Sequence, residues 1–186
     1  MKKTLYFAFF LSVTAMLVTG IAYAGYNWAE PIIAENRITT IDNNISLLFS
    51  KEDGYERNSA QLENSYLEKN YKPINEIYEV LDSDGNIYVL IYNTSVQGRN
   101  GIIDALVAVD PYNDTVVAVS YYSHTETPNI GEVYTRDVEV AKLVGQPLDS
   151  VQVDVISGAS TTWASIMTMF ENIKLHYNAE GVHIDG

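Results

Sequence analysis

Hydroxyl side chains and small residues are concentrated in one short stretch, which runs from Asp154 to Thr162 with the sequence DVISGASTT. Apolar residues recur at helical spacing from Ser160 onward, so the stretch leads into the start of a helix. Unpaired N–H groups at a helix start, together with the positive end of the helix dipole, favour binding of a phosphate. An ordinary helix cap, in which a Ser or Thr side chain accepts a backbone hydrogen bond, is the alternative explanation. The candidate anion-binding residues are Ser157, Gly158, Ala159, Ser160, Thr161 and Thr162.

A second polar stretch lies upstream, at residues 124–131, with the sequence HTETPNIG. Taken alone, a Thr-Pro turn at the end of a strand accounts for it, and Asn129 is a residue that tolerates left-handed backbone. The three histidines of the chain belong to no metal-ligand constellation, and no nucleophile elbow or Gly-rich nucleotide loop is present. The sequence therefore predicts no metal site and no catalytic residue.

The composition excludes several classes of function. The chain has 186 residues with 24 acidic and 11 basic side chains, for a net charge of −13. Because affinity for nucleic acid comes largely from Lys and Arg, we expect no nucleic-acid partner. The absence of cysteine excludes disulfides, Cys-ligated zinc, iron–sulfur clusters and covalently attached c-type haem. Any redox cofactor must be held by other means.

An apolar stretch near the amino terminus predicts a membrane anchor at residues 1–28. Residues 5–24 are 20 in number and carry no charge, and as a helix they span about 30 Å, the thickness of the hydrocarbon core. Lys2 and Lys3 before the stretch and acidic residues after it predict a cytoplasmic amino terminus and an extracytoplasmic domain. A cleaved secretory signal is the alternative, since Ala22-Tyr23-Ala24 resembles a cleavage site.

The rest of the chain predicts an α+β domain, an antiparallel sheet packed against helices. Helical spacing continues through residues 26–49, and residues 51–72 are polar and read as a loop, so residues 29–73 form a helical and loop connection. Residues 74–180 form the domain, and residues 181–186 form a tail. Its expected strands are residues 74–81, 87–92, 102–109, 115–122 and 151–156. Its expected helix, residues 160–177, has a buried face of Trp163, Ile166, Met167, Phe170, Ile173 and Tyr177.

The stretch DVISGASTT resembles the flavinylation motif of the FMN-binding domain family. In that motif the hydroxyl residue directly after Gly-Ala is esterified to the phosphate of FMN, which implies that Ser160 is the acceptor. Ser stands here where Thr is commoner, so Thr161 is the alternative acceptor. The resemblance also implies that Asp154 serves the attachment step, which a separate magnesium-dependent flavin transferase performs with FAD.

The upstream stretch HTETPNIG resembles the H-x-E-T-P-G-L-G segment of two members of this family. These are the G subunit of Rnf complexes and the C subunit of the sodium-translocating NADH:quinone reductase. Asn129 replaces the usual glycine. The segment approaches the flavin in the family, which implies a place in the pocket for His124, Glu126 and Thr127.

The resemblance implies a membrane-anchored flavoprotein subunit of an ion-translocating electron-transport complex of the Rnf type. Electrons would pass through covalently attached FMN, and the partners would be membrane lipid and the membrane, iron–sulfur and flavin subunits of the complex. A stand-alone exported FMN-binding electron carrier and the quinone reductase C subunit are alternatives. A non-redox anchored surface domain, in which SGAST only caps a helix, is the alternative from another class.

Overall fold

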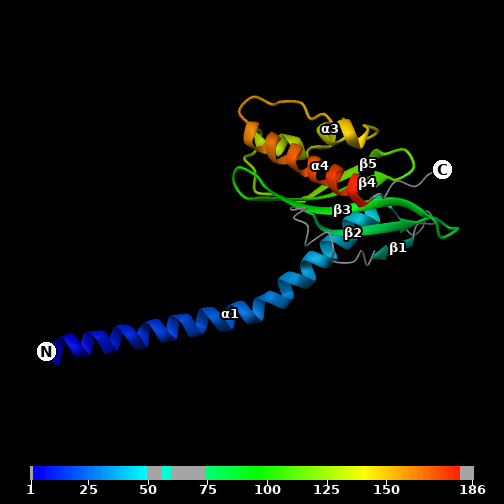
Figure 1. The fold of residues 1–186 in the computed structure, drawn as a ribbon. Helices are drawn as coiled ribbons and strands as arrows, with labels where there is room; N and C mark the ends of the chain where they lie inside the picture. Colours follow the sequence, from blue (N-terminus) through cyan, green and yellow to red (C-terminus); the bar gives the residue numbers. More distant parts are fainter. Residues whose placement is uncertain (1, 50–55, 60–73, 181–186) are drawn as a thin grey trace. The chain divides into compact units, whose positions relative to one another are not determined.

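The computed structural model describes residues 2–49, 56–59 and 74–180 of the chain (Figure 1). Residues 1–43 and 44–186 form two compact units. The predicted anchor and the helical segment after it are one continuous helix, α1 (Lys2–Leu48), of 47 residues with Pro31 inside it. By length and composition, this helix is apolar enough to cross a membrane.

The second unit contains an antiparallel sheet of five strands in the order β1-β2-β3-β4-β5. The strands are β1 (Glu56–Ser59), β2 (Ile74–Leu81), β3 (Ile87–Gln97), β4 (Ile102–Asp110) and β5 (Thr115–Ser123). Four of the five strands expected from the sequence are confirmed, and β3 runs five residues further than residue 92 because Asn93, Thr94 and Val96 continue its buried pattern. Each strand pairs with the next in sequence, and short turns connect β2 to β3, β3 to β4 and β4 to β5.

Two expectations about the strands are wrong. Residues 56–59 pair with β2 as β1, although the polar composition of residues 51–72 indicated a loop. The other residues of that expected loop, and the expected tail at 181–186, lie outside the described residues. Residues 151–156 form no strand. Several of their backbone groups are bonded instead to side chains of Gln146, Tyr134 and Trp163, so a ladder with the sheet does not form.

The helix α4 (Ser160–Glu180) packs on one face of the sheet, mainly against β3 (Figure 1). Its buried face confirms that the apolar stripe is core, with one correction: Met169, not Met167, is the fully buried methionine. Residue 169 lies three positions from Ile166 and four from Ile173, which places it on the same side of the helix. Between β5 and α4 lie three short helices, η2 (Gly131–Thr135), α3 (Asp137–Val140) and η3 (Leu148–Ser150).

The last residues of α1 contact the sheet within the same unit as the strands. The hydroxyl of Ser120 donates a 2.8 Å hydrogen bond to Oδ1 of Asn44, and the rings of Phe49 and Tyr88 meet edge to face with centroids 6.3 Å apart. These contacts join Asn44 and Phe49, which both belong to the second unit, to β5 and β3 of the same unit.

Candidate functional site

The start of α4 has no side-chain cap from a Ser or Thr at its N-cap position. The backbone N–H of Trp163 donates to the carbonyl of Ala159 at 2.9 Å, so Ala159 occupies the N-cap position, and its methyl group accepts no hydrogen bond. The N–H groups of residues 160–162 precede this first helical bond and have no partner inside the helix. The arrangement therefore differs from the ordinary cap and leaves donors directed away from the helix start, as an anion site requires.

A tight turn places Ser160 at this helix start. Gly158 has φ +84, a conformation that favours glycine, and the N–H of Ala159 donates to the carbonyl of Ile156 at 3.1 Å. Ala159 is buried in the hydrophobic core, so its small side chain sets how closely the turn approaches the sheet. Ser160, the next residue, is exposed. The Gly-Ala pair thus turns the chain and presents the hydroxyl after it.

The hydroxyl groups of the stretch differ sharply in exposure. Ser157, Ser160 and Thr161 are exposed, whereas Thr162 is only 1% exposed. The hydroxyl of Thr162 donates a 2.5 Å hydrogen bond to Oε2 of Glu126. The hydroxyl of Thr162 is therefore buried and already hydrogen-bonded. Ser160 and Thr161 carry the two hydroxyls at the helix start that an incoming phosphate can reach.

Glu126 lies against the first turn of α4, where its carboxylate is occupied by groups of the protein. Its place in a cofactor pocket stays a prediction. The residue is 5% exposed, and its Oε1 accepts the backbone N–H of Asn100 at 3.1 Å. Gly98 and Gly131 lie against the two carboxylate oxygens so closely that a Cβ at either position would clash with them. Glu126 thus joins three segments: the turn after β3, the loop after β5 and the first turn of α4.

Thr127 and His124 lie around this junction. The Oγ1 of Thr127 accepts a hydrogen bond from the side-chain amide of Asn100 at 2.7 Å. The Nε2 of His124 lies 3.2 Å from Oγ1 of Thr135, which itself donates to the carbonyl of Glu132. Since that hydroxyl has one proton, Nε2 of His124 is the donor in their contact.

An ion pair between Arg136 and Glu132 holds the loop between Thr127 and η2. Asn129 has φ 59, the left-handed backbone that its residue type tolerates. The Arg136 guanidinium donates to both carboxylate oxygens of Glu132, at 3.2 and 2.7 Å, and to Oδ1 of Asn129 at 2.7 Å. The pKa of Glu132 is lowered to about 2. The hydrogen bond from Arg136 is the larger cause, and the hydrogen bond from the N–H of Asn129 is the next.

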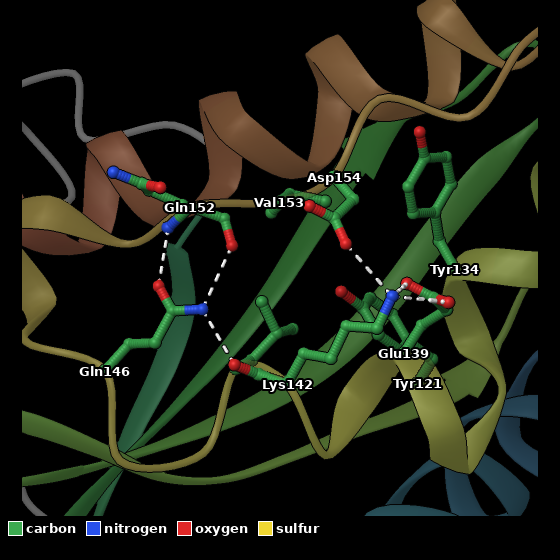
Figure 2. Close-up of a pocket in the computed structure, with 9 residues that line it drawn as sticks. Tyr121, Tyr134, Glu139, Lys142, Gln146, Gln152, Val153 and Asp154 are labelled. Atoms are coloured by element: carbon green, nitrogen blue, oxygen red, sulfur yellow. Dashed lines mark hydrogen bonds and ion pairs between the residues drawn. The ribbon is translucent and has the colours of Figure 1, made fainter.

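Asp154 lies at the other end of the stretch, with its side chain 73% exposed. Its Oδ2 is 3.0 Å from Nζ of Lys142, which also contacts both carboxylate oxygens of Glu139 at 2.9 and 2.8 Å. Figure 2 shows the ammonium group between the two acids. A cavity of about 140 Å³ adjoins this bridge and is lined by Tyr121, Tyr134, Glu139, Lys142, Leu143, Gln146, Gln152, Val153 and Asp154.

An open groove of about 350 Å³ lies beside the exposed acceptor candidates, between the end of β3 and the first turns of α4. Ser165 links its two walls, because its hydroxyl lies 2.6 Å from the carbonyl of Gln97 and 3.0 Å from that of Thr161. Sequence reasoning missed this groove, although small residues four apart on the polar side of the helix were a visible signal. The lining residues are Ser95, Val96, Gln97, Thr161, Ala164, Ser165 and Thr168.

Comparison with known proteins shows what this chain is similar to. Residues 98–173 match the model of the FMN-binding domain. The G subunit of the ion-translocating oxidoreductase complex of Methanosarcina acetivorans is 24% identical over 115 residues, which cover 58% of this chain and 61% of that protein. The crystal structure of Shewanella oneidensis NqrC has a TM-score of 0.45 and 25% identity, covering 51% of this chain and 52% of that chain. The matches therefore span about half to three-fifths of these relatives' own lengths.

Proposed function

We propose that this chain is a flavoprotein that passes electrons through FMN esterified to Ser160, because residues 98–173 match the model of the FMN-binding domain. The observation that carries the proposal is the exposed hydroxyl of Ser160 at an uncapped helix start, directly after the turn formed by the exposed Gly158 and the buried Ala159. Thr161 is the alternative acceptor. FMN supplies one-electron and two-electron transfer when bound, so the chain needs no acid–base residues of its own.

The residues at the start of α4 suit a phosphate ester. An esterified phosphate keeps a negative charge, and the backbone N–H groups of residues 160–162 stabilise that charge together with the helix dipole. The groove beside Thr161, about 350 Å³ in volume with Val96 and Ala164 in its walls, offers space and apolar surface for a planar ring. Glu126 fixes the loop after β5 to the helix start, and Thr127 fixes the same loop to Asn100 in the turn after β3.

The attachment is a phosphoryl transfer from FAD, performed by a separate flavin transferase. The Oγ of Ser160 forms a bond to the FMN phosphorus, and the bond from that phosphorus to the bridging oxygen breaks. AMP leaves with that oxygen, and the hydroxyl proton passes to a base of the transferase or to water. No group is oxidised or reduced. Asp154, exposed near the same segment, serves this step through its carboxylate.

The relatives suggest the setting in which such a flavoprotein works. One is named as the G subunit of an ion-translocating oxidoreductase complex, which supports a role for this chain as an electron-transfer subunit of an Rnf-type membrane complex. The apolar part of α1 then anchors the chain in lipid, with Lys2 and Lys3 in the cytoplasm and the FMN-binding domain outside. A covalent bond keeps the cofactor where no pool of free FMN replaces it.

The experiment is the intact mass of the full chain, extracted in detergent after production with a flavin transferase. We expect an adduct of FMN minus one water on the wild type and on Thr161→Val, and none on Ser160→Ala. In-gel flavin fluorescence under denaturing conditions gives an independent reading. An adduct retained on Ser160→Ala and lost on Thr161→Val moves the ester to Thr161, and a wild type without any adduct contradicts covalent attachment.

A further inference from the structure

The segment before α4, residues 151–159, has no regular secondary structure, yet its backbone is held at several points by side chains. The indole N–H of Trp163 donates to the carbonyl of Val153 at 2.9 Å. The hydroxyl of Tyr134 accepts the N–H of Ile156 at 2.9 Å. The segment that contains the motif is therefore held in a defined conformation by side chains, among them Trp163 and Tyr134.

Two further contacts to this segment come from Gln146. Its Oε1 accepts the N–H of Gln152 at 2.7 Å, and its Nε2 donates to the carbonyl of the same residue at 3.0 Å. The second proton of Nε2 goes to the carbonyl of Lys142 at 2.7 Å. Figure 2 shows the planar amide bonded to both backbone groups of Gln152, as a neighbouring strand would bond them, which holds this residue in place. The hold on residue 152 restrains the backbone two residues before Asp154.

Gln146 is itself fastened to the sheet. Its carbonyl accepts the N–H of Val116 at 2.9 Å, and the N–H of Gly145 donates to the carbonyl of Val116 at 2.7 Å. Gly145 has φ +83, so the turn needs glycine here. A continuous series of hydrogen bonds therefore runs from β5 through Gln146 to the backbone beside Asp154.

Lys142 completes the arrangement at the side chain of Asp154. Each of its three ammonium protons has a carboxylate oxygen within 3.0 Å, two from Glu139 and one from Asp154. The Lys142 side chain is 46% exposed, and exposed ion pairs of this kind contribute little to folding stability. The bridge restricts the Asp154 side chain without being needed for the fold.

We propose that Gln146 and Lys142 are positioning residues that present Asp154 and the motif segment to the flavin transferase. Gln146 holds the backbone of the segment at residue 152, and Lys142 holds the carboxylate of Asp154 on the side of α3. This inference rests on the proposed attachment of FMN at Ser160. Neither residue contacts the acceptor, so both act on the attachment step through Asp154.

The test is the rate of FMN attachment to the full chain by a purified flavin transferase with FAD, followed by intact mass as the chain concentration is varied. For Lys142→Met we expect kcat to fall about tenfold with KM nearly unchanged, since small displacements of a participating group are costly. Lys142→Arg, which also bridges two carboxylates, restores most of the rate. Gln146→Ala lowers the rate similarly and speeds hydrogen exchange at the Gln152 amide.

Lys174→Met is the matched control, because Lys174 makes the same type of ion pair, with Glu171 three residues earlier on α4, and the substitution removes the same charge. It should be modified at the wild-type rate. Wild-type rates in both Lys142→Met and Gln146→Ala overturn the inference and leave the proposed function intact. A rate in Lys142→Arg as low as in Lys142→Met also overturns the role of Lys142. A wild type that acquires no adduct overturns the attachment and this inference together.

Discussion

The hydroxyl of Thr162 and the carboxylate of Glu126 form a buried 2.5 Å hydrogen bond between residues 36 positions apart in the chain. The bond joins the first turn of α4 to the loop that follows β5. The same carboxylate also accepts the N–H of Asn100. One buried acid therefore joins three segments at Thr162, the residue that directly follows the exposed Ser160 and Thr161.

Removing the carboxylate of Glu126 should destabilise the domain. In Glu126→Ala, the Asn100 N–H and the Thr162 hydroxyl lose their acceptors inside the protein, and each unsatisfied buried group costs about 1 to 3 kcal/mol. Glu126→Gln keeps an acceptor oxygen and should lose less. Denaturant unfolding of the full chain in detergent measures both. Glu171→Ala, which removes an exposed acid, is the control, and equal stability of Glu126→Ala and this control would contradict the prediction.

A methyl group at Gly131 should disturb the same junction. The added Cβ would lie 2.6 Å from Oγ1 of Thr162 and closer still to Oε2 of Glu126, so the two must separate. We expect Gly131→Ala to lower the free energy of unfolding by about 1 to 3 kcal/mol, as overpacking typically does. Gly25→Ala adds a methyl group with no heavy atom within 4 Å and should cost nothing. The thermal midpoints of the two variants give the comparison, and equal midpoints would refute the predicted clash.

Much of the fold could be predicted because its signals are local. The period-2 pattern and the Asp-Gly turn at residues 82–86 predicted β2 and β3, and the apolar spacing after Ser160 predicted the start of α4 at the residue where it begins. The position of Ser160 beside a Gly-Ala pair was visible for the same reason. The turn needs a residue that adopts positive φ, and Gly158 supplies it.

What could not be predicted depends on contacts between distant residues. Residues 151–156 have the composition of a strand, but Gln146 bonds to both backbone groups of Gln152, and nothing in the sequence marks a single glutamine for that task. Thr162 and Thr161 are adjacent and chemically alike. Only the position of Glu126 in the folded domain shows that Thr162 is buried and hydrogen-bonded, whereas Thr161 is exposed.

The Glu132 carboxylate should give the domain a distinctive response to acid. Its hydrogen bonds from Arg136 and from the N–H of Asn129 lower its pKa from 4.5 to about 2. The folded state therefore binds the proton less readily than the unfolded chain, so this group stabilises the fold above pH 4.5 and loses that contribution as pH falls toward 2. Glu132→Gln should show a shallower fall of the thermal midpoint across this window.

Arg136→Met provides the control for that acid response. Its guanidinium is the largest cause of the lowered pKa of Glu132, so the single variant should also flatten the pH dependence. Combined with Glu132→Gln it should add little, because the two substitutions remove one interaction. An unchanged slope in Glu132→Gln would mean that this ion pair does not persist in solution.

The hydroxyl of Tyr121 should be dispensable for stability. It is buried, no group in the described part of the chain bonds to it, and burial raises its pKa above the ordinary value. Because an unsatisfied buried donor is unfavourable, Tyr121→Phe should be as stable as the wild type or more stable by up to about 1 kcal/mol.

Tyr177→Phe is the contrast, since the hydroxyl of Tyr177 donates to Oδ1 of Asp114 at 2.5 Å and its removal should cost about 1 kcal/mol. Thermal unfolding of both variants decides the matter: an equal loss in Tyr121→Phe would mean that its hydroxyl is satisfied by water in the cavity it lines.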